Sequence, residues 1–369
     1  MPAQRFRINP FFQPIRDPQP ETRNGKVLEF HKSLPGYQPT PLHVLPGLAA
    51  DLGVGKICVK DESARFGLNA FKALGASYAI HRFLNSRAGD GEKPITFATA
   101  TDGNHGRAVA WAARRVGHAA VIYVPRNTVP ARIEAIRGEG AQVVVVDGTY
   151  DQAVERAAAD SAANHWQVIS DTSYPGYMEI PGWIMEGYGT LFVETGGQIE
   201  QMGYPPPDLV FVQAGVGGLA CAALQHCHGS ALVCVEPTEA DGLLESICSE
   251  NGEPQVSKGN QNSLMAGLNC GIPSLLAWPV LRAGIRCFLS VEDRYAVAAM
   301  RRFYCPASGD PRIISGESGA AGLAGLLALC QEPDFRIARE QLGISVRSSI
   351  LLINTEGDTD PVSFQKICN

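Results

Sequence analysis

The sequence predicts an α/β fold built from parallel sheets with helices on both faces. Short runs of apolar and β-branched residues alternate with longer, alanine-rich segments of helical character along most of the chain. Strands buried on both faces form continuous apolar runs of this kind, and the helices between them are the crossovers that parallel strands require. With 369 residues, 45% of them hydrophobic, the chain is long enough for two lobes around a shared cleft.

The elements follow in order from the apolar runs and from the breaks between them. Strands are expected at 56–59, 95–98, 120–124, 142–146, 168–170, 209–213, 232–236 and 350–354, and helices at 105–116, 129–138, 150–163 and 219–228. One break falls at 173–176, and the proline-rich 204–207 directly precedes the strongest strand. We assign residues 1–75 and 187–369 to a large lobe and residues 76–186 to a small one.

Charge and composition exclude several classes of protein. The net charge is −6, the pI is about 5.8, and no run of Lys and Arg is present. A nucleic-acid partner is therefore not expected. The segment 1–7 lacks an apolar signal-peptide core, and no stretch approaches the roughly 20 apolar residues of a membrane span. We expect a cytoplasmic protein with no membrane partner.

The 10 cysteines are scattered and form no Cys-x-x-Cys pair. We expect buried, reduced thiols that act as small hydrophobes. His226, Cys227 and His228 form the one cluster of metal-ligand type, but neighbouring positions on a helix point apart. No metal site is expected.

Lys72 lies in the segment Asn-Ala-Phe-Lys-Ala-Leu-Gly-Ala at 69–76, where most neighbours are apolar or small. An apolar surround favours the neutral amine, and a neutral lysine amine condenses with an aldehyde to give a Schiff base. Lys72 is therefore a candidate anchor for pyridoxal 5′-phosphate (PLP), and the large lobe at 1–75 and 187–369 is the one expected to bind it. A lysine taken singly is more often a solvated surface charge, and it is the surround that favours the anchor.

The segment Thr-Asp-Gly-Asn-His-Gly at 101–106 places a carboxylate, an amide and two glycines in one turn. These are the groups needed to hold an amino-acid carboxylate and to move a proton. Together with Lys72 they suggest amino-acid chemistry. Asp102 also fits the simpler role of a residue that stabilises the turn.

A glycine loop, Ala-Gly-Val-Gly-Gly at 214–218, lies between an expected strand and an expected helix. Glycines let successive backbone N–H groups converge on one point, and a helix N-terminus adds positive potential, so a phosphate fits there. A tight turn without a ligand fits the same residues, and the loop lacks the Gly-Lys-Ser/Thr of a Walker A motif. The segments 315–321 and 354–358 are further glycine-bearing turns.

These motifs occur in the order seen in fold-type II PLP enzymes, which the chain resembles. The shared motifs are the Asn-Ala-Phe-Lys segment, the Gly-Asn-His-Gly turn, the Gly-Val-Gly-Gly loop, a Glu-Ser-Gly-Ala-Ala segment and a hydroxyl residue after the last core strand. Longer segments are similar to those of diaminopropionate ammonia-lyases: 60–72, 100–107, 171–172 with 179–181, and 354–361. The resemblance runs from about residue 25 to the C-terminus. It implies two lobes, each with a mostly parallel twisted sheet, and an active site in the cleft between them.

Carried over residue by residue, the resemblance implies how cofactor and substrate are held. Lys72 would form the Schiff base with PLP, and Phe71 would flank the cofactor ring. Asn104 would bond the phenolic oxygen, and Thr355 would lie by the pyridine nitrogen. Gly215, Val216, Gly217 and Gly218 would cradle the phosphate. The amino-acid substrate would be bound by Thr101, Asp102, Gly103, Asn104, His105 and Asp171, with its carboxylate at Thr101 and at the backbone N–H groups around Gly103 and Asn104.

The choice of 2,3-diaminopropionate as the expected substrate depends on Asp102 and Asp171. Threonine dehydratases usually have a small residue at the position of Asp102, whereas diaminopropionate ammonia-lyases resemble this chain in having aspartate. A carboxylate there can pair with a β-ammonium group and can act as a base on the face opposite Lys72. The resemblance implies that Lys72 serves the L isomer and Asp102 the D isomer, and that Asp171 helps to bind the diamine.

The resemblance therefore predicts a homodimeric carbon–nitrogen lyase that converts 2,3-diaminopropionate to pyruvate and ammonia. A serine/threonine-type dehydratase or a β-replacement enzyme on the same scaffold is the alternative, and Asp102 speaks against it. A non-catalytic PLP-binding paralogue is a third interpretation, which the intact Lys72 disfavours.

Overall fold

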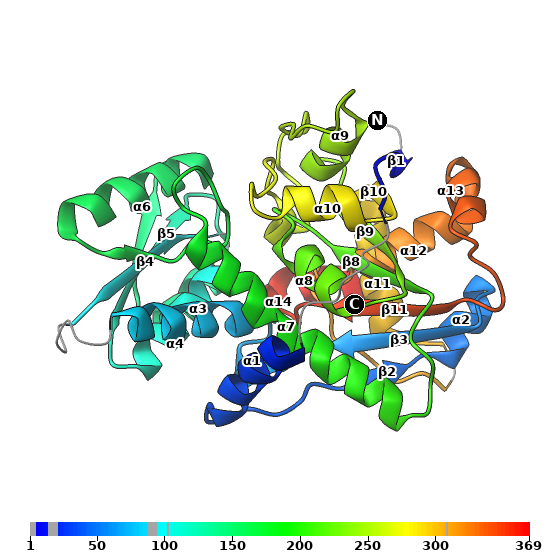
Figure 1. Cartoon of the computed structure of the whole chain (residues 1–369), viewed down its shortest axis with the longest axis horizontal. Coiled ribbons are helices and arrows are strands. Elements are labelled where there is room, and N and C mark those ends of the chain that lie inside the picture. Colours follow the sequence, from blue (N-terminus) through cyan, green and yellow to red (C-terminus); the bar gives the residue numbers. More distant parts are fainter. Residues whose placement is uncertain (1–4, 14–20, 88–93, 102, 149, 308) are drawn as a thin grey trace.

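The computed structural model describes residues 5–13, 21–87, 94–101, 103–148, 150–307 and 309–369. Within these residues the strands form one sheet of seven strands and one of four. Figure 1 shows the smaller sheet with its helices on the left and the larger sheet on the right. The two-lobed α/β architecture expected from the sequence is confirmed.

The larger sheet has the strand order β1-β10-β9-β8-β11-β3-β2. Its strands are β1 (Arg5–Ile8), β2 (Leu42–Val44), β3 (Lys56–Asp61), β8 (Leu209–Gln213), β9 (Ala231–Pro237), β10 (Cys287–Val291) and β11 (Ser349–Asn354). All inner strands run parallel, whereas β1 and β2 pair antiparallel at the two edges. Every residue of β8 and of β10 is buried, which is why these strands have no polar face.

The smaller sheet has the order β6-β5-β4-β7 and is parallel throughout. Its strands are β4 (Thr96–Ala100), β5 (Ala119–Pro125), β6 (Gln142–Val146) and β7 (Gln167–Val168). The last strand ends earlier than the expected 168–170, because the N–H of Ser170 donates to the hydroxyl of Tyr177. β1, β2 and β10 were not expected from the sequence. The two edge strands among them are too short for a periodic pattern.

The helices are α1 (Glu21–Ser33), α2 (Pro46–Leu52), α3 (Lys72–Ser86), α4 (Asn104–Arg115), α5 (Pro130–Gly138), α6 (Tyr150–Asn164), α7 (Glu179–Gln201), α8 (Gly218–His226), α9 (Gly242–Cys248), α10 (Trp278–Gly284), α11 (Asp293–Tyr304), α12 (Ala321–Gln331), α13 (Arg336–Gln341) and α14 (Pro361–Cys368). Short 3₁₀ turns occupy Arg65–Gly67, Ala266–Leu268 and Pro333–Phe335. The helices expected at 105–116, 129–138, 150–163 and 219–228 are α4, α5, α6 and α8.

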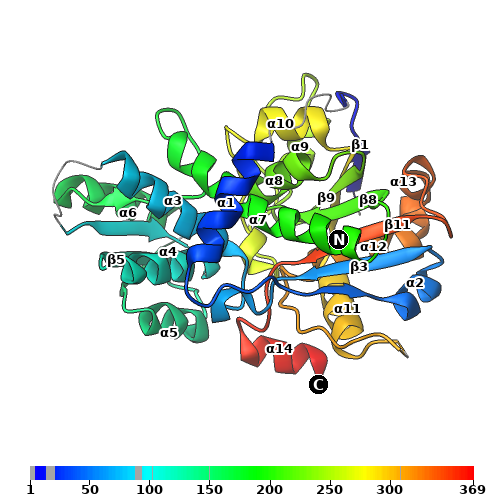
Figure 2. The same ribbon diagram turned by 60° about the horizontal axis from the view of Figure 1, so that its bottom comes forward.

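The lobes meet where α3 packs against the long helix α7. A Cβ at Gly75 would lie 2.5 Å from Tyr188 Cε1, and one at Gly187 would lie 2.5 Å from the carbonyl oxygen of Leu74. Glycine at both positions therefore allows the two backbones to approach closely. Figure 2 shows α1 crossing this junction. The lobe boundaries that we placed at 75/76 and 186/187 fall inside these two helices and stay a prediction.

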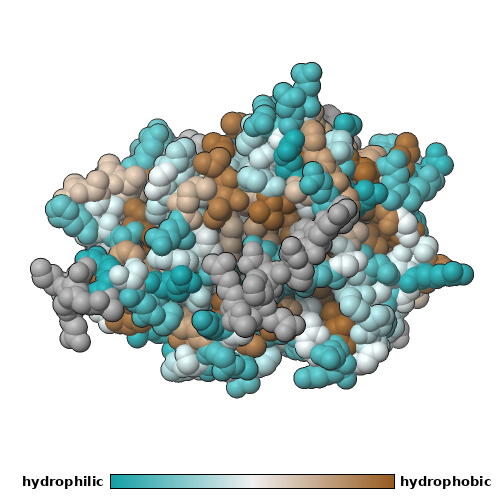
Figure 3. Space-filling view, viewed as in Figure 1, coloured by the Kyte–Doolittle hydropathy of each residue, from teal (hydrophilic) through white to brown (hydrophobic). Residues whose placement is uncertain are grey.

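The surface is mixed in polarity. Figure 3 shows polar side chains over most of the face seen in Figure 1, with apolar ones gathered near its centre. In the described part of the chain, no helix has the length and hydropathy of a membrane span.

The expectation that the cysteines are buried is wrong for Cys248 and Cys305, which are exposed.

Candidate active site

A cavity of about 950 Å³, including its open mouth, lies where the two lobes meet. Its walls come from the carboxyl ends of β4, β8 and β11 and from the start of α3. The carboxyl ends of parallel strands share one edge of a sheet, so loops far apart in sequence converge there. The sequence-predicted site residues that line it are Phe71, Lys72, Thr101, Gly103, Asn104, His105, Asp171, Gly215, Val216, Gly217, Gly218 and Thr355. Asp102 lies outside the described residues.

The segment that leads to Lys72 is fixed by a buried network of charges. Arg65 donates to both carboxylate oxygens of Glu62 and to both of Glu194, at 2.7–2.8 Å. Lys60 donates to Glu194 at 2.7 Å. Buried charges are tolerated when they are paired and hydrogen-bonded in this way. The network ties the loop between β3 and α3 to α7, so it holds Lys72 at the first turn of α3.

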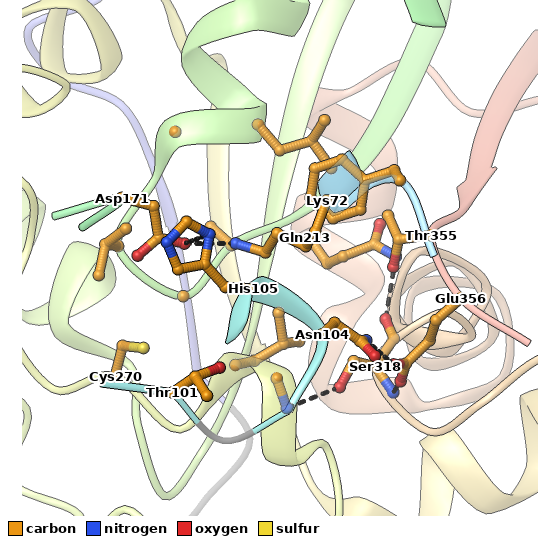
Figure 4. A pocket seen from close by; sticks show the side chains of 18 of the residues that line it. Lys72, Thr101, Asn104, His105, Asp171, Gln213, Cys270, Ser318, Thr355 and Glu356 are labelled. Atoms are coloured by element: carbon orange, nitrogen blue, oxygen red, sulfur yellow. Dashed lines mark hydrogen bonds and ion pairs between the residues drawn. The ribbon is translucent and has the colours of Figure 1, made fainter. Parts of the chain in front are cut away.

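Lys72 is paired with Asp171 across the cavity (Figure 4), with Nζ donating to Oδ2 at 2.5 Å. Burial lowers the pKa of Lys72, but the charges of Asp171 and Tyr188 outweigh burial and raise that pKa above its ordinary value. Burial raises the pKa of Asp171, but the nearby Lys72 outweighs it and lowers that pKa. The expectation that the apolar surround keeps the Lys72 amine neutral is therefore wrong, because the charge of Asp171 outweighs burial. The amine is an ammonium group because Asp171 stabilises its charge.

The imidazole ring of His105 lies beside this pair, and one of its ring nitrogens makes no hydrogen bond among the described residues. Its Nε2 lies 2.7 Å from the carbonyl oxygen of Ile169. A carbonyl only accepts, so Nε2 carries the proton and Nδ1 presents its lone pair. Nδ1 is buried, has no hydrogen-bond partner among the described residues, and lies 4.0 Å from Asp171 Oδ2. Burial also lowers the pKa of His105, so the ring is neutral and can accept a proton.

The turn before α4 is organised by the Thr101 hydroxyl, which accepts from the N–H groups of Gly103 at 2.9 Å and Gly106 at 3.0 Å. A Cβ at position 106 would lie 2.3 Å from the Thr101 methyl group, which explains the glycine. The N–H of Gly103 is thereby engaged within the turn. Helix geometry leaves the N–H groups of Asn104 and His105 without an intrahelical acceptor, so they can receive an anion.

Opposite Lys72, Asn104 donates through Nδ2 to Glu356, which also accepts from the N–H of Ser318 at 3.1 Å. Thr355 lies beside this group, and its Oγ1 accepts from Gln213 Nε2 at 3.0 Å. The hydroxyl hydrogen of Thr355 is therefore free to donate. Figure 4 shows these side chains on the far side of the cavity from Asp171.

The glycine loop leads from β8 to the first turn of α8. Gly217 has φ of +100°, and a Cβ there would lie 2.5 Å from a methyl group of Leu281. Among the described residues no side chain caps the start of α8. Its first N–H groups therefore remain available to a phosphate. This cradle, a lysine amine and a hydroxyl donor in one cavity fit the phosphate, the aldehyde and the ring nitrogen of PLP.

The family model "Pyridoxal-phosphate dependent enzyme" matches residues 34–337. The fold and the site thus define a PLP-dependent enzyme of fold type II, and PLP is its cofactor. Diaminopropionate ammonia-lyase of Salmonella typhimurium is 40% identical over 93% of this chain and 91% of its own length. For the enzyme of Escherichia coli, the identity is 41% over 97% of this chain and 94% of its own length. The chain belongs to the diaminopropionate ammonia-lyase family, whose members are carbon–nitrogen lyases.

A solved structure of the E. coli enzyme supports the same assignment. It contains an "aminoacrylate-PLP azomethine reaction intermediate" and superposes with a TM-score of 0.92. The identity is 39%, and the match covers 99% of this chain and 96% of the other.

Several residues of the cavity were not expected from the sequence: Arg132, Tyr188, Gln213, Cys270, Ser318 and Glu356. Ser318 and Glu356 lie in the glycine-bearing turns at 315–321 and 354–358, and Gln213 ends the strand expected at 209–213. These positions in the sequence could have indicated that all three residues line the site. Arg132 and Tyr188 lie on helices with no motif. In the described part of the chain, no group of three or more His, Cys, Asp or Glu side chains could hold a metal ion.

Proposed function

We propose that the protein eliminates ammonia from 2,3-diaminopropionate and yields pyruvate and ammonia. The observation that carries this proposal is the Lys72–Asp171 pair, because it places a base and an ammonium-binding carboxylate in one cavity beside a phosphate cradle. Bound PLP supplies an electron sink for negative charge at the substrate Cα. The steps below concern the protein's own side chains.

Five features of the chain would hold the cofactor in this proposal. Lys72 would attach it, Phe71 would flank its ring, and Asn104 would contact the phenolic oxygen through the amide hydrogen that Glu356 does not use. Thr355 would donate its hydroxyl hydrogen to the ring nitrogen. The phosphate is held by Gly215, Val216, Gly217 and Gly218 at the start of α8.

Substrate binding changes the charge around Lys72. The substrate carboxylate is held at Thr101 and at the free N–H groups of Asn104 and His105. The β-ammonium group pairs with Asp171, which neutralises the charge that raises the pKa of Lys72. The Lys72 amine then becomes a neutral base that removes the Cα proton of the L isomer.

The leaving ammonia and the other isomer need further groups. The β-amine leaves from its ammonium form, paired with Asp171, so that the Cβ–N bond breaks with both electrons on nitrogen and neutral ammonia departs. The bare Nδ1 of His105, 4.0 Å from Asp171 Oδ2, accepts a hydrogen bond from the leaving group. Asp102 removes the Cα proton of the D isomer from the opposite face. The released aminoacrylate hydrolyses to pyruvate.

Steady-state release of pyruvate from a panel of amino acids tests the proposal. The panel contains D- and L-diaminopropionate, serine, threonine and O-acetylserine, with Lys72→Ala as the inactive control. We expect the highest kcat/KM for diaminopropionate. Higher kcat/KM for serine or threonine would support the dehydratase alternative, and higher kcat/KM for O-acetylserine would support β-replacement.

The protein's assembly and location belong to the same proposal. A homodimer and a cytoplasmic location rest on the family resemblance alone. Light scattering coupled to size exclusion tests the first, and a mass equal to one chain of 39.4 kDa would contradict it.

A further inference from the structure

Arg132 lies at the neck between the active-site cavity and a second cavity. It belongs to the first turn of α5, its exposed fraction is 8%, and it lines both cavities. The second cavity encloses about 1870 Å³, including open solvent, and joins the small lobe to the loop 260–269 and to α14. Tyr150 also lines both cavities, so a substrate that moves from the outer cavity to Lys72 passes Arg132 and Tyr150.

Among the described residues, Arg132 forms no ion pair and its buried Nε makes no hydrogen bond. Arg137, on the same helix, pairs with Glu134 at 2.7 Å. A buried, unpaired guanidinium is costly for a folded protein, so its retention at a cavity wall indicates an anionic ligand.

The acidic side chains of the outer cavity are already engaged. Asp147 pairs with Arg126 at 2.6 Å, and Asp360 caps α14 by accepting from the N–H of Ser363 at 3.2 Å. Glu317 accepts from the Ser363 hydroxyl. None of them forms an ion pair with Arg132, although its charge reaches Glu317 and partly offsets the effect of burial, which raises the pKa of that carboxyl. The guanidinium is therefore left without a close counter-ion among the described acids of the cavity.

Two further features place this charge on the substrate path. The stem of Arg132 packs against Gly103, because a Cβ at position 103 would lie 2.7 Å from Arg132 Cδ. The guanidinium thus lies next to the turn that receives the substrate carboxylate. Thr128, which also lines the outer cavity, has a buried hydroxyl with no partner among the described residues.

We propose that Arg132 and Thr128 form a subsite for small carboxylates at this neck. The subsite takes the α-carboxylate of the entering amino acid before it reaches the turn at 101–106, and it takes pyruvate as the product leaves. Its role in the reaction rests on the function proposed above, but its affinity for a carboxylate does not. Arg132 is a positioning residue in this scheme, because the reacting atoms lie beyond it.

The test compares the holoenzyme with three variants. Arg132→Met keeps the packing against Gly103 and removes the charge, Arg132→Lys keeps the charge, and Arg137→Met makes the same change at the exposed position on α5. Calorimetry gives the Kd of pyruvate, and steady-state assays give KM and kcat for diaminopropionate. Inhibition by 1,2-diaminoethane, which lacks a carboxylate, reports on the rest of the site.

For Arg132→Met we expect the pyruvate Kd and the substrate KM to rise about 10-fold or more, as for the loss of a charge-assisted hydrogen bond. The value of kcat should stay within about 2-fold, since the charge acts before the chemical step. Arg132→Lys should recover part of the loss. Arg137→Met and inhibition by 1,2-diaminoethane should be unchanged.

An unchanged pyruvate Kd in Arg132→Met overturns the subsite. So does a loss of kcat at constant KM, or equal weakening of 1,2-diaminoethane, since both indicate a structural role. If Arg132→Met does not fold, Thr128→Val and Arg132→Lys give the same test through smaller rises in the pyruvate Kd. If wild type binds pyruvate through Arg132 but does not turn over diaminopropionate, the proposed function fails and the subsite stands.

Discussion

Replacing Asp171 with Asn should lower the pKa of Lys72 and speed the capture of PLP by the protein without cofactor. The Nζ–Oδ2 contact is 2.5 Å, and the charge of Asp171 is a main cause that raises this pKa. Asparagine keeps the shape and removes the charge. Burial lowers the pKa of Lys72, and without the charge of Asp171 this neighbour no longer opposes that effect.

The size of the effect follows from the charge pair. Two unit charges about 4 Å apart at an effective dielectric constant of about 20 interact by about 4 kcal/mol, which corresponds to about 3 pKa units. Only the neutral amine attacks an aldehyde, so a lower pKa gives more reactive amine at a given pH. A less basic amine is also a weaker nucleophile. We therefore expect the Asp171→Asn variant to capture PLP about 10- to 100-fold faster than wild type at about pH 7. This is less than the roughly 1,000-fold rise in neutral amine that 3 pKa units would give, because the less basic amine is a weaker nucleophile.

Stopped-flow absorbance of the Schiff base at saturating PLP measures this rate across pH. The wild-type rate should rise about 10-fold per pH unit through neutrality, because Lys72 titrates above its ordinary value. The variant should reach its plateau at lower pH. Asp147→Asn is the control, since Asp147 is an exposed carboxylate paired with Arg126. Superimposable pH profiles for wild type and Asp171→Asn would refute the electrostatic account of this pair.

Three other changes have distinct expected outcomes. Lys72→Ala should lose the visible absorbance of the lysine–PLP Schiff base while Lys32→Ala keeps it, and a colourless wild type after incubation with PLP would contradict the assignment of the cofactor anchor. Asp102→Asn should reduce turnover of D-diaminopropionate by on the order of 100-fold and that of the L isomer less; equal loss for both isomers would show that Asp102 binds the diamine without selecting a face. Gly217→Ala should weaken PLP binding by about 10-fold in equilibrium dialysis, because φ is +100° there and a Cβ would meet a leucine methyl group at 2.5 Å; Gly196→Ala, whose Cβ would meet nothing within 4 Å, is the control, and equal PLP affinity in both variants would argue against the phosphate cradle.

Local sequence patterns determined the fold class, because they depend on residues that are close along the chain. The inner strands β3, β8, β9 and β11 each contain a continuous apolar run, since helices cover both of their faces. The glycine loop at 214–218 and the turn at 101–106 combine residues whose backbone roles can be inferred from their types. The edge strands β1 and β2 were missed, because three or four residues carry no period and their pairing is decided by the neighbouring strand.

The charge state of the site was decided by the tertiary structure alone. Lys72 and Asp171 are 99 positions apart in sequence, and their contact reverses the prediction of a neutral amine. The tautomer of His105 depends on the carbonyl of Ile169, and the buried Nε of Arg132 is found to lack a hydrogen bond only in the folded chain. Electrostatic energy depends on distance and burial in space, which sequence neighbours do not report. The sequence therefore determined which chemical groups the protein brings to its site, and the fold determined which of them carry charge.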